Sequence, residues 1–291
     1  MIQICEVGPR DGLQNEKKLI STDDKVQMIR KLIDAGIKKI EAVSFVNPKV
    51  VPQMADAEEV LKHAPRVDGV EYAGLVLNYS GMKRALETNL ETFHIVTATS
   101  DEFNLKNAKK TVEQSVDELV KVINESVQMK KKVAGVLGTA FGCPFSGEVP
   151  VSRLLEVAEA FVKAGASEIT LADTTGLANP LQVKEIVNEF QNHFKTDVQL
   201  GLHFHNTRGL GIANVLAGYQ AGIRHFDSSI AGLGGCPFAP KAVGNVCTED
   251  IVNMFHEMKV ETGTDLSKLI KAADWMEQLM EKPLDGMLMK L

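Results

Sequence analysis

Hydrophobic and polar positions along the chain follow two alternating periods. Stretches with a two-residue period predict strands, and stretches with a helical period fill the gaps between them. The clearest helical stripes lie at 154–162 and 183–194, where apolar residues recur every three or four positions. Eight strands are expected, spaced 22 to 41 residues apart, beginning near Ile2, Ile37, Val70, Thr92, Val133, Ser167, Val198 and His225.

A weak internal repeat supports this division. Residues 34–44, 163–173 and 220–230 each end a helix at a glycine, where a positive φ is cheap, and then enter a strand with the same alternation. Because neighbouring side chains of a strand point to opposite faces, the repeat separates an apolar set from a polar set. The apolar set, Ile40, Ile169 and Phe226, suits packing against helices, and the polar set, Glu41, Thr170 and Asp227, is expected to point inward.

Eight successive strand–helix units predict an α/β protein with a (β/α)₈ TIM barrel. The alternative is an open doubly wound sheet, but the first strand leads into GPRDGLQNE and not into a GxGxxG phosphate loop. No linker divides the chain. We therefore expect one catalytic domain over 1–291, with the barrel at about 2–260 and an additional C-terminal helical region at about 261–291.

Composition narrows the class of protein further. The chain has 291 residues, of which 44% are hydrophobic and 24% charged, so it can bury a large core. A net charge of −6 argues against nucleic acid or a membrane surface as partner. No apolar run is long enough to span a bilayer, and no signal peptide is evident. The four cysteines form no CxxC pair and are expected to be reduced thiols of a cytoplasmic protein.

In a TIM barrel, functional groups gather at the C-terminal ends of the strands. Arg10 and Asp11 follow the first strand, as a fixed cation and a carboxylate that could bind metal or act as a base; a loop salt bridge is the alternative. Glu41 and Ser44 close the second strand. An inward Glu41 is costly unless it is paired, so it is either a buried partner of Arg10 or a catalytic group, or both. Asp173 leaves the sixth strand, where a turn-forming role competes with function.

The seventh strand carries the sharpest local signal. Its residues alternate so that His203 and His205 share the inner face, where two imidazoles can reach one metal ion. A pair of hydrogen-bonded core histidines is the alternative. After the eighth strand, a glycine-rich loop places Cys236 near the barrel mouth, and Asn245 follows it. A thiol near cations can act as an acid or a base, whereas an ordinary loop cysteine is the alternative.

Three segments together point to a family. EVGPRDGLQNE, HFHNTRGLGIAN and GLGGCPFAPKAVGN closely resemble the hydroxymethylglutaryl-CoA lyase family of metal-dependent TIM-barrel lyases, and the resemblance runs in order from about residue 2 to 260. The Gly-Leu-Gly-Gly-Cys-Pro loop is the most specific part. The His-x-His segment is shared with carboxylate synthases of the same barrel group. Asn206 departs from the pattern of the animal lyases, which carry Asp at this position.

The resemblance implies cleavage of (S)-3-hydroxy-3-methylglutaryl-CoA (HMG-CoA) to acetyl-CoA and acetoacetate, with a divalent cation, Mg²⁺ or Mn²⁺, as cofactor and an acyl-CoA as partner. It places the chemistry in leucine degradation and ketone body metabolism and leaves a homodimer open. Nitrogen and oxygen ligands alone would also suit Zn²⁺, Co²⁺ or Fe²⁺. The implied metal ligands are Asp11, His203, His205 and Asn245.

The family also implies roles for individual side chains. Arg10 would stabilise the departing thioester enolate, and Cys236 would protonate the carbanion. The base stays open between Asp11 and His203, and Glu41 would hold Arg10 or join proton transfer. Asp173 would orient a histidine. The residues expected to contact substrate are Arg10, Ser44, Lys17 and Asp173, with Lys17 either near the CoA phosphates or simply solvated.

Other functions fit parts of the same pattern. A lyase for a related 3-hydroxy acyl-CoA would use the same groups. A synthase that condenses acetyl-CoA with a 2-oxo acid would too, but the Cys-Pro after Gly-Leu-Gly-Gly and the short C-terminus count against it. A barrel that only binds ligands is the third alternative, and bound metal would argue against it.

Overall fold

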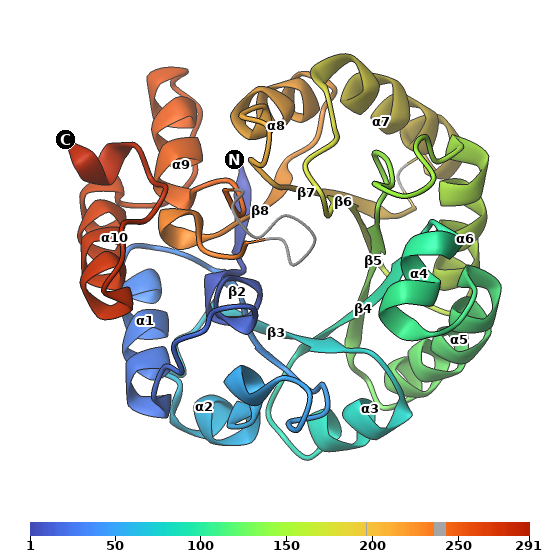
Figure 1. The fold of residues 1–291 in the computed structure, drawn as a ribbon, viewed down its shortest axis with the longest axis horizontal. Coiled ribbons are helices and arrows are strands. Elements are labelled where there is room, and N and C mark those ends of the chain that lie inside the picture. Colours follow the sequence, from blue (N-terminus) through green and yellow to red (C-terminus); the bar gives the residue numbers. More distant parts are fainter. Residues whose placement is uncertain (196, 236–242) are drawn as a thin grey trace.

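Eight parallel strands close into a barrel in chain order, as the computed structural model shows for residues 1–195, 197–235 and 243–291 (Figure 1). The predicted (β/α)₈ barrel is therefore confirmed, and every expected strand start lies within two residues of the observed one. The strands are β1 (Gln3–Glu6), β2 (Lys39–Ser44), β3 (Glu71–Val76), β4 (Thr92–Ala98), β5 (Lys132–Gly138), β6 (Glu168–Asp173), β7 (Gln199–Phe204) and β8 (His225–Ser228).

Helices surround the barrel on its outer side (Figure 1). Short helical turns interrupt the loops at η1 (Gly8–Gly12), η2 (Pro52–Met54), η3 (Ile230–Gly232) and η4 (Leu288–Lys290). The helices are α1 (Thr22–Asp34), α2 (Ala57–His63), α3 (Tyr79–Leu86), α4 (Asp101–Ala108), α5 (Val112–Gln128), α6 (Val151–Lys163), α7 (Pro180–Phe194), α8 (Gly211–Gln220), α9 (Thr248–Glu257) and α10 (Leu266–Met280).

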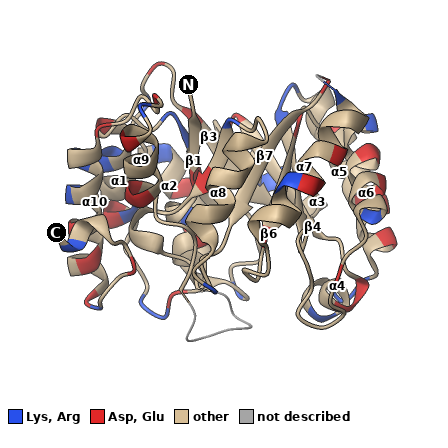
Figure 2. Cartoon of the chain, turned by 90° about the horizontal axis from the view of Figure 1, so that it is seen from above, with Lys and Arg blue, Asp and Glu red and all other residues tan. Residues whose placement is uncertain are grey.

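The amphipathic pattern explains how these layers pack. All five apolar residues of the α7 stripe are buried, as predicted. In α6 the buried face is slightly rotated from the expected one, because Val157 is buried while Leu155 and Val162 are only half-buried. Figure 2 shows acidic and basic residues interspersed on the outer helices. The hydrophobic core therefore lies between the helices and the outer face of the barrel.

The internal repeat is confirmed in its details. Each of its three glycines has a positive φ of +94° to +109°. Ile40, Ile169 and Phe226 are at most 1% exposed, whereas Glu41 contacts His94 of β4 and Asp227 contacts His203 of β7. These alternating strands leave a polar interior, which supplies the side chains of the site.

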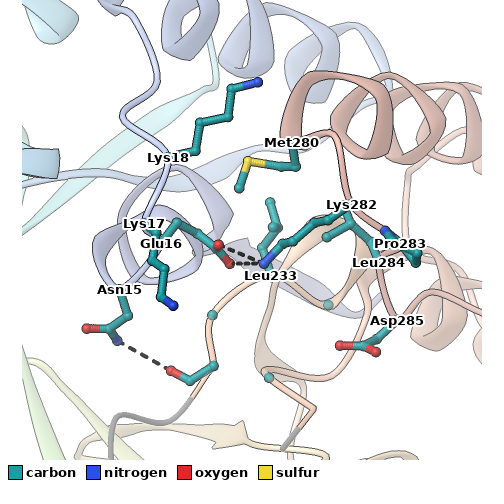
Figure 3. A pocket seen from close by; sticks show the side chains of 14 residues that line it. Asn15, Glu16, Lys17, Lys18, Leu233, Met280, Lys282, Pro283, Leu284 and Asp285 are labelled. Carbon is teal, nitrogen blue, oxygen red and sulfur yellow. Dashed lines mark hydrogen bonds and ion pairs between the residues drawn. The ribbon is translucent and has the colours of Figure 1, made fainter. Parts of the chain in front are cut away.

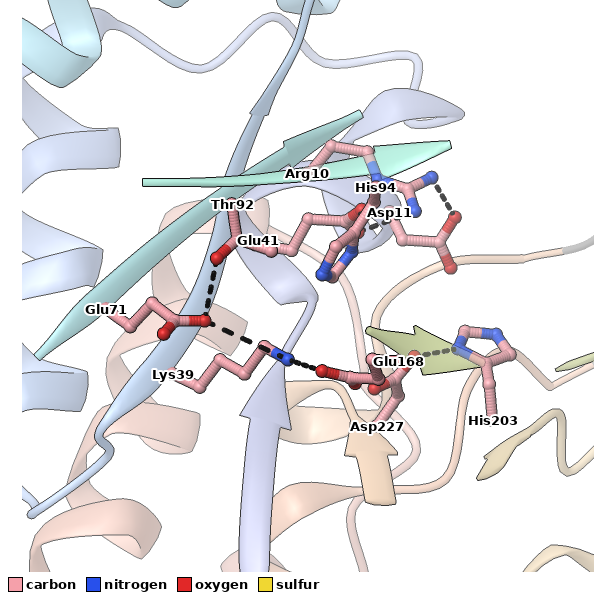
Figure 4. Close-up of polar contacts among 10 residues, drawn as sticks. All are labelled: Arg10, Asp11, Lys39, Glu41, Glu71, Thr92, His94, Glu168, His203 and Asp227. Atoms are coloured by element: carbon pink, nitrogen blue, oxygen red, sulfur yellow. Dashed lines mark hydrogen bonds and ion pairs between the residues drawn. The ribbon is translucent and has the colours of Figure 1, made fainter. Parts of the chain in front are cut away.

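The two ends of the barrel differ in their polar groups. At the N-terminal ends of the strands, Lys39 lies 2.6 Å from Glu168 and 4.0 Å from Glu71 (Figure 4). Glu71 is also 2.5 Å from Lys132. These charges are paired with one another, and they line a cavity of about 320 Å³ at this end of the barrel.

The expected C-terminal helical region is present as α10 and η4. α10 packs against α1 and α9, and the Lys31 ammonium lies 5.2 Å from the centre of the Trp275 ring. Across the described ranges, no helix is long and apolar enough to cross a membrane. This region closes the ring of helices beside the loops that follow β1 and β8.

Candidate metal and active site

Three predicted ligands come together at the C-terminal ends of the strands. Each of Asp11, His203 and His205 offers a ligand atom, and these atoms lie within 4.8 Å of one another. His203 and His205 reach the cluster because they share the inner face at the end of β7, and Asp11 because the tight turn η1 follows β1 directly. Both histidines are buried, with exposed fractions of 8% and 7%.

Asn245, the fourth predicted ligand, lies beside this cluster. Its Nδ2 donates to Asp11 Oδ2 at 2.8 Å and to the Leu233 carbonyl at 3.0 Å. Its Oδ1 is buried and has no hydrogen-bond partner among the described residues, and the same is true of His205 Nδ1. Buried polar atoms without partners are costly, so an amide oxygen and an imidazole nitrogen left free beside a carboxylate fit a divalent cation.

The electrostatics of the cluster suit a cation as well. Burial would raise the pKa of Asp11, but Arg10 and the two histidines lower it to about 2. Burial and the neighbouring His203 lower the pKa of His205 to about 4. Near neutral pH the site therefore contains an ionised carboxylate and a neutral imidazole at His205, which are the protonation states that bind metal.

His203 has a carboxylate partner, Asp227, that was not predicted for it. Its Nδ1 lies 3.2 Å from Asp227 Oδ2, and although burial lowers the pKa of His203, the contact with Asp227 raises it above its ordinary value. Asp173, expected to orient a histidine, instead accepts the backbone N–H groups of Leu177 and Ala178, as a turn former does. Asp227 could have been found, since it is an inward position of the repeat, one strand away from His203.

Arg10 meets both carboxylates that were proposed for it. Its Nε donates to Glu41 Oε2 at 2.6 Å, and its Nη1 to Asp11 Oδ1 at 2.8 Å (Figure 4). The loop salt bridge and the buried partnership with Glu41 therefore both exist. Burial would raise the pKa of Glu41, but Arg10 and His94 keep it below its ordinary value. His94 was missed, although it occupies an inner position of β4 opposite Glu41.

Three predicted site residues remain, and they lie in different surroundings. Ser44 is buried at the end of β2, and its Oγ has no partner among the described residues. Lys17 is exposed in the loop after η1. Cys236 lies outside the described residues, as do the neighbouring positions 237–242.

A cavity of about 520 Å³ lies beside Asn245, and the neighbouring Gly234 and Gly244 form part of its wall. The loop after η1 lines one side and the segment after α10 lines the other (Figure 3). Lys282 crosses between them and lies 2.7 Å from Glu16, whereas Lys17 has no ion pair among the described residues. Gly234 forms part of the wall and lies against Asn245. The cavity therefore lies next to Asn245, and three lysines, Lys17, Lys18 and Lys282, are among its lining residues.

Comparisons with known proteins agree with one another. The HMGL-like family model matches residues 1–276. Hydroxymethylglutaryl-CoA lyase YngG of Bacillus subtilis is 42% identical over 97% of this chain and 94% of its own. An (R)-citramalyl-CoA lyase of Chloroflexus aurantiacus is 40% identical over 99% and 94%, and the human mitochondrial hydroxymethylglutaryl-CoA lyase is 37% identical over 97% and 86%.

Solved structures give the same result. The crystal structure of the Bacillus subtilis HMG-CoA lyase has a TM-score of 0.96 at 42% identity and covers 99% of this chain and 97% of its own. An HMG-CoA lyase from Acenitobacter baumannii, in complex with coenzyme A and 3-methylmalate, has a TM-score of 0.95 at 43% identity, with coverage of 100% and 94%.

Proposed function

The chain belongs to the HMGL-like family, and from this membership we propose that it is a carbon–carbon lyase that cleaves (S)-HMG-CoA to acetyl-CoA and acetoacetate. The observation that carries the proposal is the cluster of Asp11, His203 and His205 with Arg10 in contact with its carboxylate. A divalent cation bound by this cluster would have a fixed guanidinium beside it, which suits the cleavage of a 3-hydroxy acyl-CoA. We also propose that residues 1–291 form one catalytic domain.

A divalent cation, Mg²⁺ or Mn²⁺, would be held by Asp11, His203, His205 and Asn245. When bound, it would polarise the hydroxyl and carboxylate oxygens of the substrate. The support for Asn245 is its unpartnered Oδ1, and the support for His203 as an Nε2 ligand is that Nδ1 faces Asp227.

The chain's own groups handle the proton and the charge. The tertiary hydroxyl loses its proton to Asp11 or His203, the carbon–carbon bond breaks, and the electron pair moves to the thioester as an enolate. Arg10 stabilises that developing charge, and Glu41 holds Arg10 in place. Cys236 then donates a proton to the enolate carbon, which gives acetyl-CoA. The free hydroxyl of Ser44 is available to the substrate carboxylate, and Asp173 shapes the loop at the edge of the site.

The coenzyme A part would occupy the cavity beside Asn245. Lys17 supports this assignment, because it is an exposed cation at the rim without an ion pair among the described residues. The related structure from Acenitobacter baumannii contains coenzyme A, and its chain aligns with the whole of this one.

The first test is acetyl-CoA release from HMG-CoA with Mg²⁺ or Mn²⁺ and reductant. We expect cleavage by the wild type and loss of nearly all of it in Cys236→Ala, with Cys247→Ala as the matched thiol control. Activity that survives in Cys236→Ala would remove Cys236 as the essential acid. No cleavage by a metal-loaded wild type would reject the proposed substrate.

A lyase for a related acyl-CoA is the second candidate. It is favoured by the (R)-citramalyl-CoA lyase relative and by the 3-methylmalate in the Acenitobacter baumannii structure. Parallel assays with HMG-CoA and citramalyl-CoA separate the two by kcat/KM. Condensation of acetyl-CoA with 2-oxo acids in the absence of any cleavage would instead identify a synthase.

The cellular setting is part of the same proposal. We place the enzyme in the cytoplasm and in leucine degradation, with a homodimer as its assembly. Cys5, Cys143 and Cys247 are free, which fits a reducing compartment. Cell fractionation, growth on leucine after deletion, and light scattering of the purified protein test the three statements separately.

A further inference from the structure

His94 is buried inside the barrel next to Glu41, the carboxylate that contacts Arg10. It lies on the inner face of β4 with 4% exposure, and its Nδ1 is 2.9 Å from Glu41 Oε1 (Figure 4). The other ring nitrogen, Nε2, is buried and has no hydrogen-bond partner among the described residues. Within the part of the chain that the structure describes, the His94 ring therefore makes one polar contact, and that contact is with Glu41.

Glu41 links His94 to Arg10, because its two carboxylate oxygens contact one side chain each. Glu41 Oε1 faces His94, while Oε2 lies 2.6 Å from Arg10 Nε and 2.5 Å from Nη2. Arg10 Nη1 continues to Asp11 Oδ1 at 2.8 Å. One chain of hydrogen bonds therefore runs from β4 across the barrel to a proposed metal ligand, and His94 is its far end.

The hydrogen shared between His94 Nδ1 and Glu41 Oε1 can be assigned to one of the two atoms. Arg10 and His94 keep the pKa of Glu41 low despite its burial, so its carboxylate is ionised and only accepts hydrogen bonds. The hydrogen must then lie on His94 Nδ1. In a neutral ring this leaves Nε2 as a bare lone pair, which agrees with its lack of a partner.

These contacts fix the guanidinium of Arg10 but leave some of its N–H donors free. It has five N–H donors, of which one on Nε, one on Nη2 and one on Nη1 are taken by Glu41 and Asp11. The two remaining donors are on the two terminal nitrogens. Since the Arg10 side chain is still 13% exposed, the planar group is held with donors left for a substrate oxygen.

We propose that His94 is a positioning residue for the cleavage reaction, which holds Glu41 and through it fixes the orientation of the Arg10 guanidinium. The proposal rests on the proposed lyase function. A cation that stabilises developing enolate charge must be in place before the bond breaks, since an electrostatic contribution of this kind depends on preorganisation. Loss of His94 leaves Glu41 Oε1 buried without its partner and frees the carboxylate to turn.

Three substitutions at position 94 separate the two ring nitrogens. Asparagine places an amide nitrogen where Nδ1 lies, glutamine places one where Nε2 lies, and leucine keeps the bulk with neither. We expect His94→Gln and His94→Leu to lower kcat about tenfold with little change in KM, and His94→Asn to keep kcat within about twofold of the wild type. His63→Gln, on the surface of α2, is the matched control.

Mn²⁺ affinity and the thermal midpoint of unfolding are measured for the same His94 variants. Since all four proposed ligands stay intact, calorimetry should give a similar Mn²⁺ affinity for each variant. High activity in His94→Gln with low activity in His94→Asn would overturn the proposal, because Nε2 would then be the working atom. An equal loss in all three variants, matched by a fall in thermal midpoint, would show a purely structural role and overturn it as well.

A second readout does not depend on the substrate. Nitrogen-15 NMR of the histidines in the Mg²⁺-loaded wild type, assigned with His94→Gln, should show the Nδ1–H tautomer for His94 at pH 8. The Nε2–H tautomer would refute the proposed contact even in an active lyase. A wild type without lyase activity that still shows the Nδ1–H tautomer would reject the proposed function while supporting this contact.

Discussion

The Nδ1 atom of His203 lies 3.2 Å from the carboxylate of Asp227, one strand further along the barrel. This contact directs the other ring nitrogen toward the ligand cluster and increases the basicity of the ring. Asp227 therefore supports the candidate metal site through His203, although it is not one of the proposed ligands.

We expect Asp227→Asn to weaken metal binding, because the amide holds the imidazole less firmly and in either tautomer. The loss in Mn²⁺ affinity should be about tenfold or more, measured by calorimetry. Asp68→Asn, at an exposed position, is the control. An unchanged Mn²⁺ affinity in Asp227→Asn would show that His203 does not depend on this carboxylate.

Two adjacent glycines provide a sharp test of the Asn245 ligand. Gly234 has a φ of +109°, and a methyl group on it would collide with Asn245 Nδ2 and lie 3.2 Å from the Asp11 carbonyl. A methyl group on Gly235 would meet no atom within 4 Å in residues 1–195, 197–235 and 243–291. Gly234→Ala should therefore abolish most activity and weaken Mn²⁺ binding, whereas Gly235→Ala should retain both. Equal effects of the two substitutions would contradict the role given to Asn245.

A buried carboxylate makes stability depend on pH. Glu249 accepts the backbone N–H of Ala231, and burial raises its pKa from 4.5 to about 8. Because the folded state holds this proton more tightly than the unfolded state, the stabilisation is complete below pH 4.5 and is lost as pH rises toward 8. The full effect is on the order of 5 kcal/mol.

Glu249→Gln keeps an acceptor for Ala231 and removes the ionisation. Its thermal midpoint should exceed that of the wild type at pH 9 and approach it at pH 5. Glu148→Gln, which is exposed, should show no such pH-dependent difference. Parallel curves for wild type and Glu249→Gln would mean that Glu249 ionises at its ordinary pKa.

Substitution of Asp173 can distinguish a turn-forming role of this side chain from a contact with the substrate. Its two oxygens accept N–H groups of Leu177 and Ala178 at 2.7 and 3.1 Å. Asparagine can accept only one of them and turns an N–H donor toward the other, which should cost about 1–3 kcal/mol of stability. Asp173→Asn should thus unfold at lower denaturant concentration with an unchanged KM for the acyl-CoA. A raised KM at unchanged stability would instead support the substrate contact.

Local patterns predicted much of this protein because they report local physics. The alternation of His203 and His205 with apolar neighbours places both rings on one face of a strand, whatever the strand pairs with. The glycines at 36, 165 and 222 end helices by their own conformational freedom. The order of eight such units leaves few topologies other than a closed barrel.

The sequence by itself thus determined the barrel, the strand ends and the residues whose chemistry collects there. Only the tertiary structure decided which of these groups meet: Asp227 rather than Asp173 at His203, and His94 at the far end of the Arg10 chain. The physical reason is that a hydrogen bond forms only within a narrow range of distances, so shifts of a few tenths of an ångström between residues tens of positions apart decide which groups pair. Those distances are set by strand register and barrel closure, which no local pattern contains.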